Sequence, residues 1–219
     1  MRAHTRLLLL PALLVLLSPA PATAQGLLDE FSYEGLRLAS LGADLGVTFS
    51  NRLERHASAS LRVDAGWIAP HIRPLLSVGF LRADYAADEI ARLEARLRDV
   101  VIDPTNDFTI DIGTITLTDF ALDLDLQYLP VRSGPVFPYA GVGLGIHIRD
   151  AKGAAIQGTL IEDGLQAVVA GLNGTAGVEV AVMSTLRVTL EARGVVASGL
   201  NTVSLRGGVM YRLPWRGNP

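Results

Sequence analysis

The 219-residue sequence contains no cysteine, which excludes a disulfide framework, a thiolate metal site and a cysteine nucleophile. Charged residues make up only 19% and the formal net charge is −3, so a basic surface for nucleic acid is not expected. After residue 24 no apolar run approaches the ~20 residues that a membrane helix needs. The chain is nevertheless 49% hydrophobic and has 22 glycines, which is too apolar for a disordered protein.

Residues 1–24 have the pattern of a cleaved signal peptide. Arg2 and Arg6 form a basic start, residues 7–17 are apolar, and Ala22-Thr23-Ala24 provides a small-x-small cleavage site. The mature chain would begin at Gln25, and the loss of two arginines would change its formal charge from −3 to −5. We therefore expect an exported protein.

The mature chain alternates between apolar and polar residues in eight segments, least regularly in 72–81, where Leu75 and Leu81 fall on the polar face. Between residues 39 and 50, for example, the odd positions are apolar and the even positions are Ser, Gly, Asp or Thr. This period of two is typical of a strand with two different faces, and each segment is near the ~9–11 residues of a tilted membrane strand. The pattern predicts an all-β, eight-stranded antiparallel up-and-down transmembrane β-barrel, with strands at 39–50, 57–69, 72–81, 119–128, 139–148, 170–180, 186–193 and 203–212.

The composition of the polar faces favours a narrow lumen over a solvent-exposed surface. Soluble barrels carry many flexible charges outside, but the only lysine here, Lys152, lies outside the predicted strands. The polar faces mix glycine and serine with charges of both signs, which can share a lumen if they are paired. We expect a structural network of lumen side chains formed by Asp44, Arg62, Asp64, Asp123, Asp125, His147, Glu179, Arg187, Glu191, Arg193, Arg206 and Arg212.

The connections are unequal in length, as in outer-membrane barrels. The longest, 86–118 and 149–168, are both odd-numbered, so with periplasmic termini they would lie outside. Within the first of them, residues 87–101 predict a short amphipathic helix whose apolar face holds Ile90, Leu93, Leu97, Val100 and Val101. Asp88 with Arg92 and Glu94 with Arg98 would form i,i+4 pairs. Such a helix could cover the barrel mouth, which we favour, or offer a surface to a partner or lipid. Residues 108–117 are expected to extend the fourth strand.

The signal peptide, the 138–145 strand (PYAGVGLG) and the closing 203–213 strand resemble the small outer-membrane barrels of the OmpA/OmpW type. The resemblance implies a lead-in at 25–35, a barrel at 36–213 and a C-terminal tail at 214–219, in the outer membrane of a Gram-negative-type bacterium. It implies contact with outer-membrane lipid and lipopolysaccharide, and with the barrel-assembly machinery during biogenesis. Such barrels often end on a terminal aromatic residue, whereas here Tyr211 and Leu213 are followed by residues 214–219 (PWRGNP). Nothing in the sequence could form the peptidoglycan-binding domain that OmpA-like proteins often carry after the barrel, so cell-wall anchoring is not implied.

Some barrels of this size modify lipid A and need a histidine base near the outer rim. The candidates here are His56, His71 and His147, of which His147 is best placed and His71 is at the wrong end. Only His56 has the expected serine partner, Ser58, which follows two residues later in the sequence. Asp119, Asp123 and Asp125 share one face and could hold a hard cation, although nearby arginines are simpler partners. No catalytic residue, metal or cofactor is therefore predicted.

Three classes of function remain open from the sequence. The first is a structural or surface-interaction protein with a lumen filled by side chains, in the form of a monomer, since a closed barrel has no free edge. The second is a narrow channel for small or apolar solutes, as the OmpW type suggests. The third, which we weigh least, is a lipid A-modifying enzyme. Nucleic acid is not an expected partner.

Overall fold

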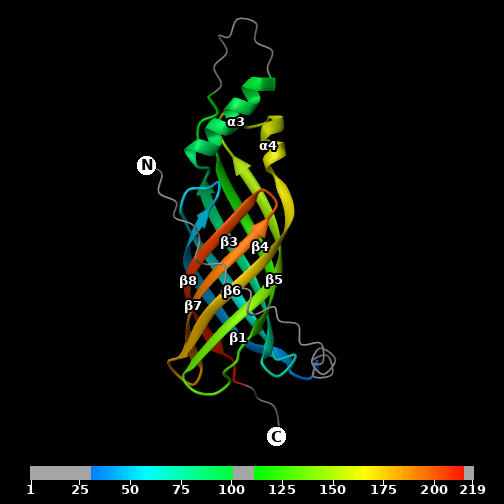
Figure 1. Cartoon of the computed structure of the whole chain (residues 1–219), viewed down its shortest axis with the longest axis vertical. Helices are drawn as coiled ribbons and strands as arrows, with labels where there is room; N and C mark the ends of the chain where they lie inside the picture. Colours follow the sequence, from blue (N-terminus) through cyan, green and yellow to red (C-terminus); the bar gives the residue numbers. More distant parts are fainter. Residues whose placement is uncertain (1–30, 101–110, 215–219) are drawn as a thin grey trace, which may run out of the picture. The chain divides into compact units, whose positions relative to one another are not determined.

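The computed structural model describes residues 31–100 and 111–214, and eight antiparallel strands in chain order close into a barrel (Figure 1). The seam is the pairing of the first strand with the last, from Ser40 opposite Arg212 to Ser50 opposite Thr202. The predicted fold class is confirmed. The strands are β1 (Leu36–Ser50), β2 (His56–Gly66), β3 (Ile72–Asp84), β4 (Thr116–Tyr128), β5 (Val136–Lys152), β6 (Ala167–Ala181), β7 (Leu186–Ala197) and β8 (Leu200–Arg212).

Several predicted boundaries differ from those observed. The signal peptide at 1–24, most of the lead-in and residues 215–219 of the tail lie outside the described residues. β5 continues to Lys152, so the lysine expected outside the strands ends one of them, exposed and 3.0 Å from the Asp150 carboxylate. β4 begins only at Thr116 rather than near 108, because the preceding Ile112 and Ile115 pack into a buried apolar cluster instead of a strand.

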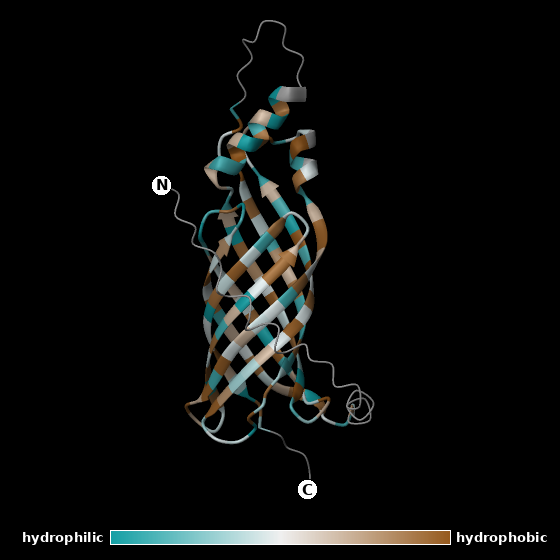
Figure 2. Ribbon diagram, in the orientation of Figure 1, coloured by the Kyte–Doolittle hydropathy of each residue, from teal (hydrophilic) through white to brown (hydrophobic). Residues whose placement is uncertain are grey.

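Side chains alternate between the two sides of the barrel wall, as the hydropathy colouring along each strand shows (Figure 2). On β1, Leu45 is 72% exposed whereas Asp44 beside it is 3% exposed. The same contrast separates Leu61 from Arg62 on β2 and Leu190 from Glu191 on β7. A protein that buries its charges and exposes its aliphatic side chains has the solvent preference of a barrel embedded in lipid. Leu75, fully buried inside, is an apolar exception on β3.

The two ends of the barrel differ. The end with the connections 67–71, 129–135 and 182–185 is called the turn end, and the other, with 51–55, 85–115, 153–166 and 198–199, the loop end. Trp67, directly after β2, and Tyr128 and Tyr211, within β4 and β8, lie close to the turn end. Towards the loop end, Phe80 and Phe120 face outward with ring centroids 5.0 Å apart. Aromatic side chains at both margins of an apolar wall are typical of membrane barrels.

An apolar cap covers the loop end. The predicted helix is present as α3 (Ala87–Val100), and Ile90, Leu93 and Leu97 pack on a buried cluster that includes Leu117 and Leu200. A second helix, α4 (Leu160–Leu165), was not predicted and adds Ile161 and Leu165 to the same cluster. The cap is the set of these two helices, the residues 111–115 and the ends of the strands below them. In the part of the chain that the structure describes, no helix is long and apolar enough to cross a membrane.

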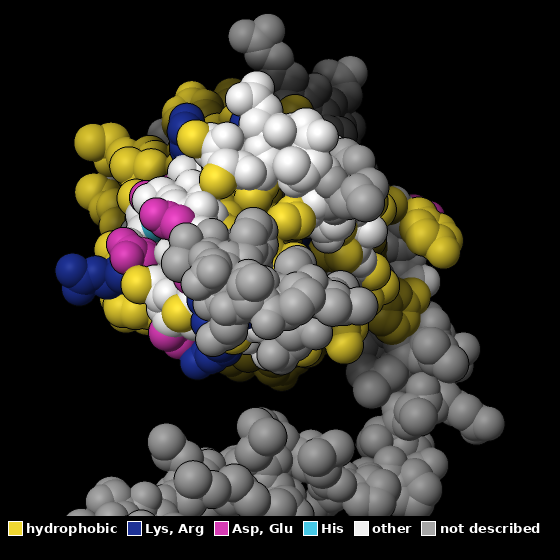
Figure 3. Space-filling model, turned by 90° about the horizontal axis from the view of Figure 1, so that it is seen from above, with side chains coloured by type: hydrophobic (Ala, Val, Ile, Leu, Met, Phe, Trp, Pro, Cys, Tyr) yellow, Lys and Arg dark blue, Asp and Glu magenta, His cyan; other side chains and the backbone are white. Residues whose placement is uncertain are grey.

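The polar side of α3 is held by charged side chains. The predicted Asp88–Arg92 pair forms, with 2.7 Å between carboxylate and guanidinium. Glu94 instead accepts a hydrogen bond from the backbone N–H of Ile112, 3.0 Å away, so it ties the helix to the returning chain rather than pairing with Arg98. Seen from above, hydrophobic side chains appear between the polar groups of this end (Figure 3). The cap therefore buries the apolar stripe of α3 on the protein's own barrel.

Candidate functional site

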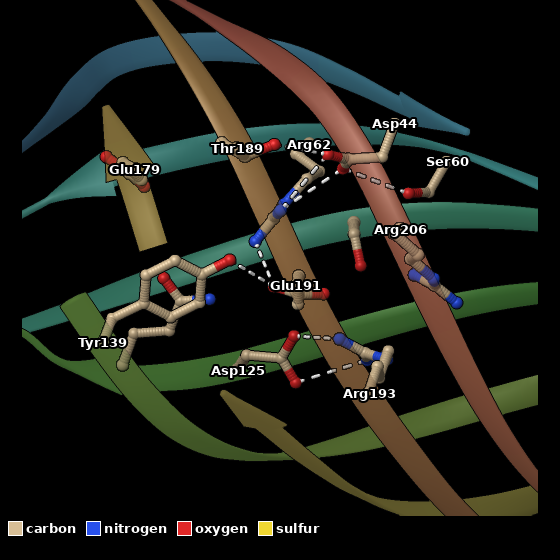
Figure 4. A network of polar contacts seen from close by, with 12 residues as sticks. Asp44, Ser60, Arg62, Asp125, Tyr139, Glu179, Thr189, Glu191, Arg193 and Arg206 are labelled. Carbon is tan, nitrogen blue, oxygen red and sulfur yellow. Dashed lines mark hydrogen bonds and ion pairs between the residues drawn. The ribbon is translucent and has the colours of Figure 1, made fainter. Parts of the chain in front are cut away.

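The middle of the lumen is occupied by a network around Arg62 (Figure 4). Its guanidinium lies 3.3 Å from the Asp44 carboxylate and 2.8 Å from that of Glu191, which joins β1, β2 and β7. The Tyr139 hydroxyl donates to the same Glu191 oxygen at 2.8 Å, and the Thr189 hydroxyl donates to Asp44 at 2.9 Å. All five side chains are less than 5% exposed. The charges therefore link strands of the barrel that are not paired with each other, such as β2 and β7.

A second network centres on Arg193 of β7. Its guanidinium lies 2.5 Å from Asp125 and 3.0 Å from Asp123, two lumen-facing carboxylates of β4. The side-chain amide of Asn173 on β6 donates to Asp123 at 2.8 Å. Arg193 is 2% exposed and Asp125 is completely buried. Burial of these carboxylates is possible because a cation and hydrogen bonds compensate for the lost water.

A third network closes the lumen near the turn end. Arg73 donates to both Glu179 and Asp64, in the latter case at 3.1 Å, and to the side-chain oxygen of Gln127 at 2.8 Å. Glu179 is shared with Arg187, whose guanidinium lies 2.7 Å away. Arg73 is 2% exposed. Below it, an open vestibule of about 650 Å³ at the turn end ends at Arg73 and Asp64.

A histidine and an arginine share one carboxylate towards the loop end. Asp119 lies 3.1 Å from Nδ1 of His147 and 3.5 Å from Nε of Arg149. Arg149 also donates to the backbone carbonyl of Ser198 at 2.8 Å, which fastens the short β7–β8 connection to β5. In the cap above, burial raises the pKa of the Tyr85 hydroxyl, so this side chain stays neutral where it packs on the apolar cluster.

Glycines make the space for these large lumen side chains. Asp125 lies opposite Gly143 and Asp123 opposite Gly145 in the β4–β5 register. A Cβ at Gly143 would meet the Asp125 carboxylate and the Leu124 carbonyl. Tyr139 stands opposite Gly177 of β6 in the same way. These three large side chains thus lie beside positions without a side chain, which helps to fill an eight-stranded barrel of small diameter.

The structure places ten of the twelve predicted network residues in these contacts, and the other two differ. Arg206 faces inward, but among the described residues no carboxylate lies within ion-pair distance of it, and its Nε donates to the Ser204 hydroxyl at 3.1 Å. Arg212 is exposed, because it is the last residue of β8 and lies where the wall ends. The residues that the prediction omitted are Arg73, Asp119, Gln127, Tyr139, Arg149, Asn173 and Thr189. The alternation places six of them on the polar faces of the predicted strands, and only Arg149 falls outside, one residue beyond the predicted fifth strand.

The three candidate histidines do not assemble a nucleophile. Nδ1 of His56 lies 2.8 Å from the Glu54 carbonyl, and the nearby Ser58 hydroxyl accepts from Thr48 instead. His71, in the β2–β3 turn with a φ of 84°, lies with Nδ1 2.8 Å from the Leu129 carbonyl. His147 forms a dyad with Asp119, but among the described residues no hydroxyl is bonded to its Nε2.

A metal is not indicated either. Of the three aspartates on β4, Asp119 contacts His147 and Arg149, whereas Asp123 and Asp125 contact Arg193. Across residues 31–100 and 111–214, no group of three or more His, Asp or Glu side chains is arranged to hold a metal ion. Arg149 and Arg193 already provide the positive charge that these carboxylates would otherwise offer to a metal cation.

Comparison with known proteins shows the fold, through similarity of structure rather than of sequence. No family model matches the sequence, and no match was found among curated proteins. The fold is similar to the crystal structure of Neisserial surface protein A, with a TM-score of 0.55 and 13% identity over 82% of this chain and 100% of that one. Ail of Yersinia pestis, crystallised with the heparin analogue sucrose octasulfate, has a TM-score of 0.48 and 9% identity, over 81% of this chain and 100% of its own. The N-terminal barrel domain of Pseudomonas aeruginosa OprF has a TM-score of 0.44 and 14% identity, over 78% of this chain and 97% of its own.

The chain therefore has the fold of the small, OmpA-like outer-membrane β-barrels, as the resemblance in its sequence indicated. At 13% identity the similarity to Neisserial surface protein A defines the fold and leaves the function to be argued from this chain's own residues.

Proposed function

We propose that this protein is an outer-membrane barrel that does not conduct solutes and that presents its cap at the cell surface, in a structural or surface-interaction role. The observation that carries the proposal is the double closure of the lumen. Three ionic networks cross it between the turn end and the loop end, and the cap packs an apolar cluster above them. An ion would have to break buried, charge-assisted contacts at every level to pass, and such contacts are costly to break.

The proposed orientation places the loop end outside and the turn end in the periplasm. Short periplasmic turns and longer outer loops are the rule for such barrels, and the exported state follows from the signal peptide predicted at 1–24. Lipid and lipopolysaccharide would contact the exposed aliphatic wall, and the assembly machinery would insert the chain. Because every strand is paired on both edges, the protein is proposed to act as a monomer.

Planar bilayer recordings test the closed lumen. We expect the purified protein to give no current steps above those of detergent alone. The control that shows the assay detects an opened barrel has α3 removed and six network residues, two from each network, replaced by serine: Arg62, Arg73, Asp125, Glu179, Glu191 and Arg193. Regular steps from the natural protein would contradict the proposal and would favour the narrow-channel alternative.

The absence of cysteine in the sequence makes orientation testable with single introduced thiols. Arg96→Cys lies on α3, where the natural side chain is 64% exposed, and Arg132→Cys lies in the exposed β4–β5 connection of the turn end. On intact cells a membrane-impermeant maleimide should label the first variant and spare the second until the outer membrane is permeabilised. Labelling in the reverse order would refute the proposed orientation.

We also propose that the protein is not an enzyme, since the His147–Asp119 dyad lies under the apolar cap and is bonded to no hydroxyl among the described residues. Mass spectra of lipid A should be unchanged when the protein is overproduced. A change in acyl-chain mass that disappears in His147→Ala would overturn this part of the proposal.

A further inference from the structure

The vestibule at the turn end has five arginines in its lining. Its volume of about 650 Å³ falls within the roughly 300–1,000 Å³ that is usual for small-molecule sites. It lies at the lower end of the barrel in Figure 1 and ends inside the lumen at Asp64 and at Arg73, which is 2% exposed. The vestibule is therefore large enough for a ligand and rich in cations. The other arginines that line it are Arg37, Arg132, Arg187 and Arg212.

These guanidiniums outnumber the carboxylates that the structure describes at the turn end. The carboxylates there are those of Glu34, Asp64 and Glu179. Asp64 pairs with Arg73, and Glu179 is shared by Arg73 and Arg187. Even with one carboxylate set against each of three arginines, two guanidiniums of the lining remain.

An excess of cations remains when all the charges of the lumen are counted together. Arg62 stands between two carboxylates, those of Asp44 and Glu191, and so leaves one negative charge. Across the described barrel, the lumen and its turn-end mouth thus hold one guanidinium more than carboxylates, and the unmatched cations lie at the mouth. Above Arg62 the numbers are equal, with Arg149, Arg193 and Arg206 beside Asp119, Asp123 and Asp125.

Arg132 and Arg212 are held at the rim of the vestibule without an acidic partner. Among the described residues no carboxylate lies within 4.0 Å of either guanidinium. The Arg132 guanidinium lies over the Trp67 ring, 4.7 Å from its centroid, an arrangement that leaves its N–H donors free. Arg212 ends β8 opposite Ser40 in the seam, so the strand pairing fixes its backbone. Cations that are already positioned lose less conformational freedom when a ligand binds.

Hydroxyl groups beside these arginines add further donors. Ser133, next to Arg132 in the β4–β5 connection, and Ser184 and Thr185 of the β6–β7 connection line the same vestibule. None of the three hydroxyls is bonded to another described residue. A carboxylate offers two oxygen atoms to such donors, whereas the phosphate group of a monoester offers three and carries up to two negative charges. The free donors and the two unmatched cations therefore fit a phosphate group better than a carboxylate.

We infer that the vestibule binds the phosphate group of a phosphate monoester through the guanidiniums of Arg132 and Arg212. Planar guanidiniums bind phosphate oxygens through paired, charge-assisted hydrogen bonds, and the neighbouring hydroxyls donate to the remaining oxygen. The same group occurs on soluble glycerol or sugar phosphates and on phosphatidic acid, whose headgroup would reach the vestibule from the lipid at the end of the wall. The site adds a ligand to the proposed function, and in the proposed orientation this ligand comes from the periplasmic side. Binding requires neither that orientation nor a closed lumen.

Isothermal titration calorimetry of the full chain in a maltoside detergent, with no phosphate in the buffer, tests the site. Glycerol phosphate should bind saturably with one molecule per barrel, and glycerol should not bind. The double variant Arg132→Gln, Arg212→Gln should bind about 10–100-fold more weakly, which is the loss expected for hydrogen bonds between charged groups. The matched control Arg92→Gln, Arg96→Gln removes two arginines of α3 that are 62% and 64% exposed. It changes the net charge equally and should keep the natural affinity.

Absence of binding to the natural protein would overturn the inference. An equal loss in both double variants would do the same, since glycerol phosphate would then respond only to net charge. Asp29 and Glu30 lie outside the described residues; if binding appears only in Asp29→Asn, Glu30→Gln, the vestibule serves the chain's own acidic residues and the inference is wrong. Arg132→Gln alone, in an exposed connection, should also bind more weakly and covers the case in which the double variant does not fold.

A second ligand separates the two sources of the phosphate group. Dihexanoyl phosphatidic acid carries the same glycerol phosphate with two short acyl chains. An affinity more than about tenfold above that of glycerol phosphate assigns the site to a lipid headgroup, and an equal affinity assigns it to a soluble ester. Either result supports the inference when the Arg132→Gln, Arg212→Gln variant binds more weakly, and a ligand that binds this variant as tightly as the natural protein overturns it. Conductance plays no part in these titrations, so the closed-lumen proposal and this site can fail independently.

Discussion

Replacement of Arg193 by methionine should strongly destabilise the barrel. The guanidinium is 2% exposed and lies 2.5 Å from Asp125 and 3.0 Å from Asp123. Arg193→Met would keep most of the side-chain volume but leave two buried carboxylates next to each other, with only the neutral donors Asn173 and Ser77, both on Asp123, as partners. Removal of one member of a buried ion pair costs about 3–5 kcal/mol. We therefore expect the unfolding equilibrium to shift by roughly two to four orders of magnitude.

The measurement is equilibrium unfolding by urea in lipid vesicles, followed by tryptophan fluorescence. Arg96→Met is the matched control, because it removes an arginine that is 64% exposed on α3 and should cost no more than about 0.5 kcal/mol. Adding Asp123→Asn and Asp125→Asn to Arg193→Met should restore more than half of the lost stability, since the unpaired charges are then gone. If Arg193→Met unfolds at the same urea concentration as Arg96→Met, the lumen is hydrated and its ion pairs contribute little.

Three further outcomes follow from the packing. Gly143→Val should cost about 1–3 kcal/mol by overpacking in the same assay, because a Cβ there meets Asp125, whereas Gly194→Val, with open space around the Cβ, should not. Tyr139→Phe should cost about 1–3 kcal/mol, since it removes the hydroxyl that donates to Glu191; unchanged stability would mean that water replaces it. Leu93→Asp should make the cap sensitive to protease while the barrel remains folded; a cap as resistant as in the natural protein would show that the helix contributes little to closure.

The number of strands and the direction of each side chain could be predicted from the sequence. A period of two leaves little freedom once one face is apolar, and the assignment of Asp44, Arg62 and Glu191 to the lumen follows from it. The alternation also predicts that Leu75 points into the lumen although leucine is apolar, and the structure confirms this direction. The apolar face of α3 could be predicted for the same reason, because Ile90, Leu93 and Leu97 recur at helical spacing.

The partners inside the lumen could not be predicted in this way. Alternation says that a side chain points inward but not how high it lies in the barrel, which depends on the stagger of all eight strands. Arg73 was therefore not recognised as the centre of the turn-end network, although its inward direction was known. Arg206 was expected to pair and does not, since Glu191 opposite it in the β7–β8 register is already held by Arg62. Loop structure such as α4 has no periodicity long enough to detect.

The distribution of glycines explains how one stagger is chosen over its alternatives. A slip of two residues keeps every side chain on its correct face, so alternation alone does not fix the register. At the closing seam, Gly42 lies opposite Met210, Asp44 opposite Gly208 and Gly46 opposite Arg206. A slip of two in one direction would put Asp44 against Met210 and Gly46 against Gly208, which combines a clash with a void. A slip in the other direction would put Gly42 against Gly208. In the observed register, each of these large lumen side chains of β1 or β8 lies opposite a glycine of the other strand, so this register fills the lumen evenly. The ionic networks across the lumen require the same register.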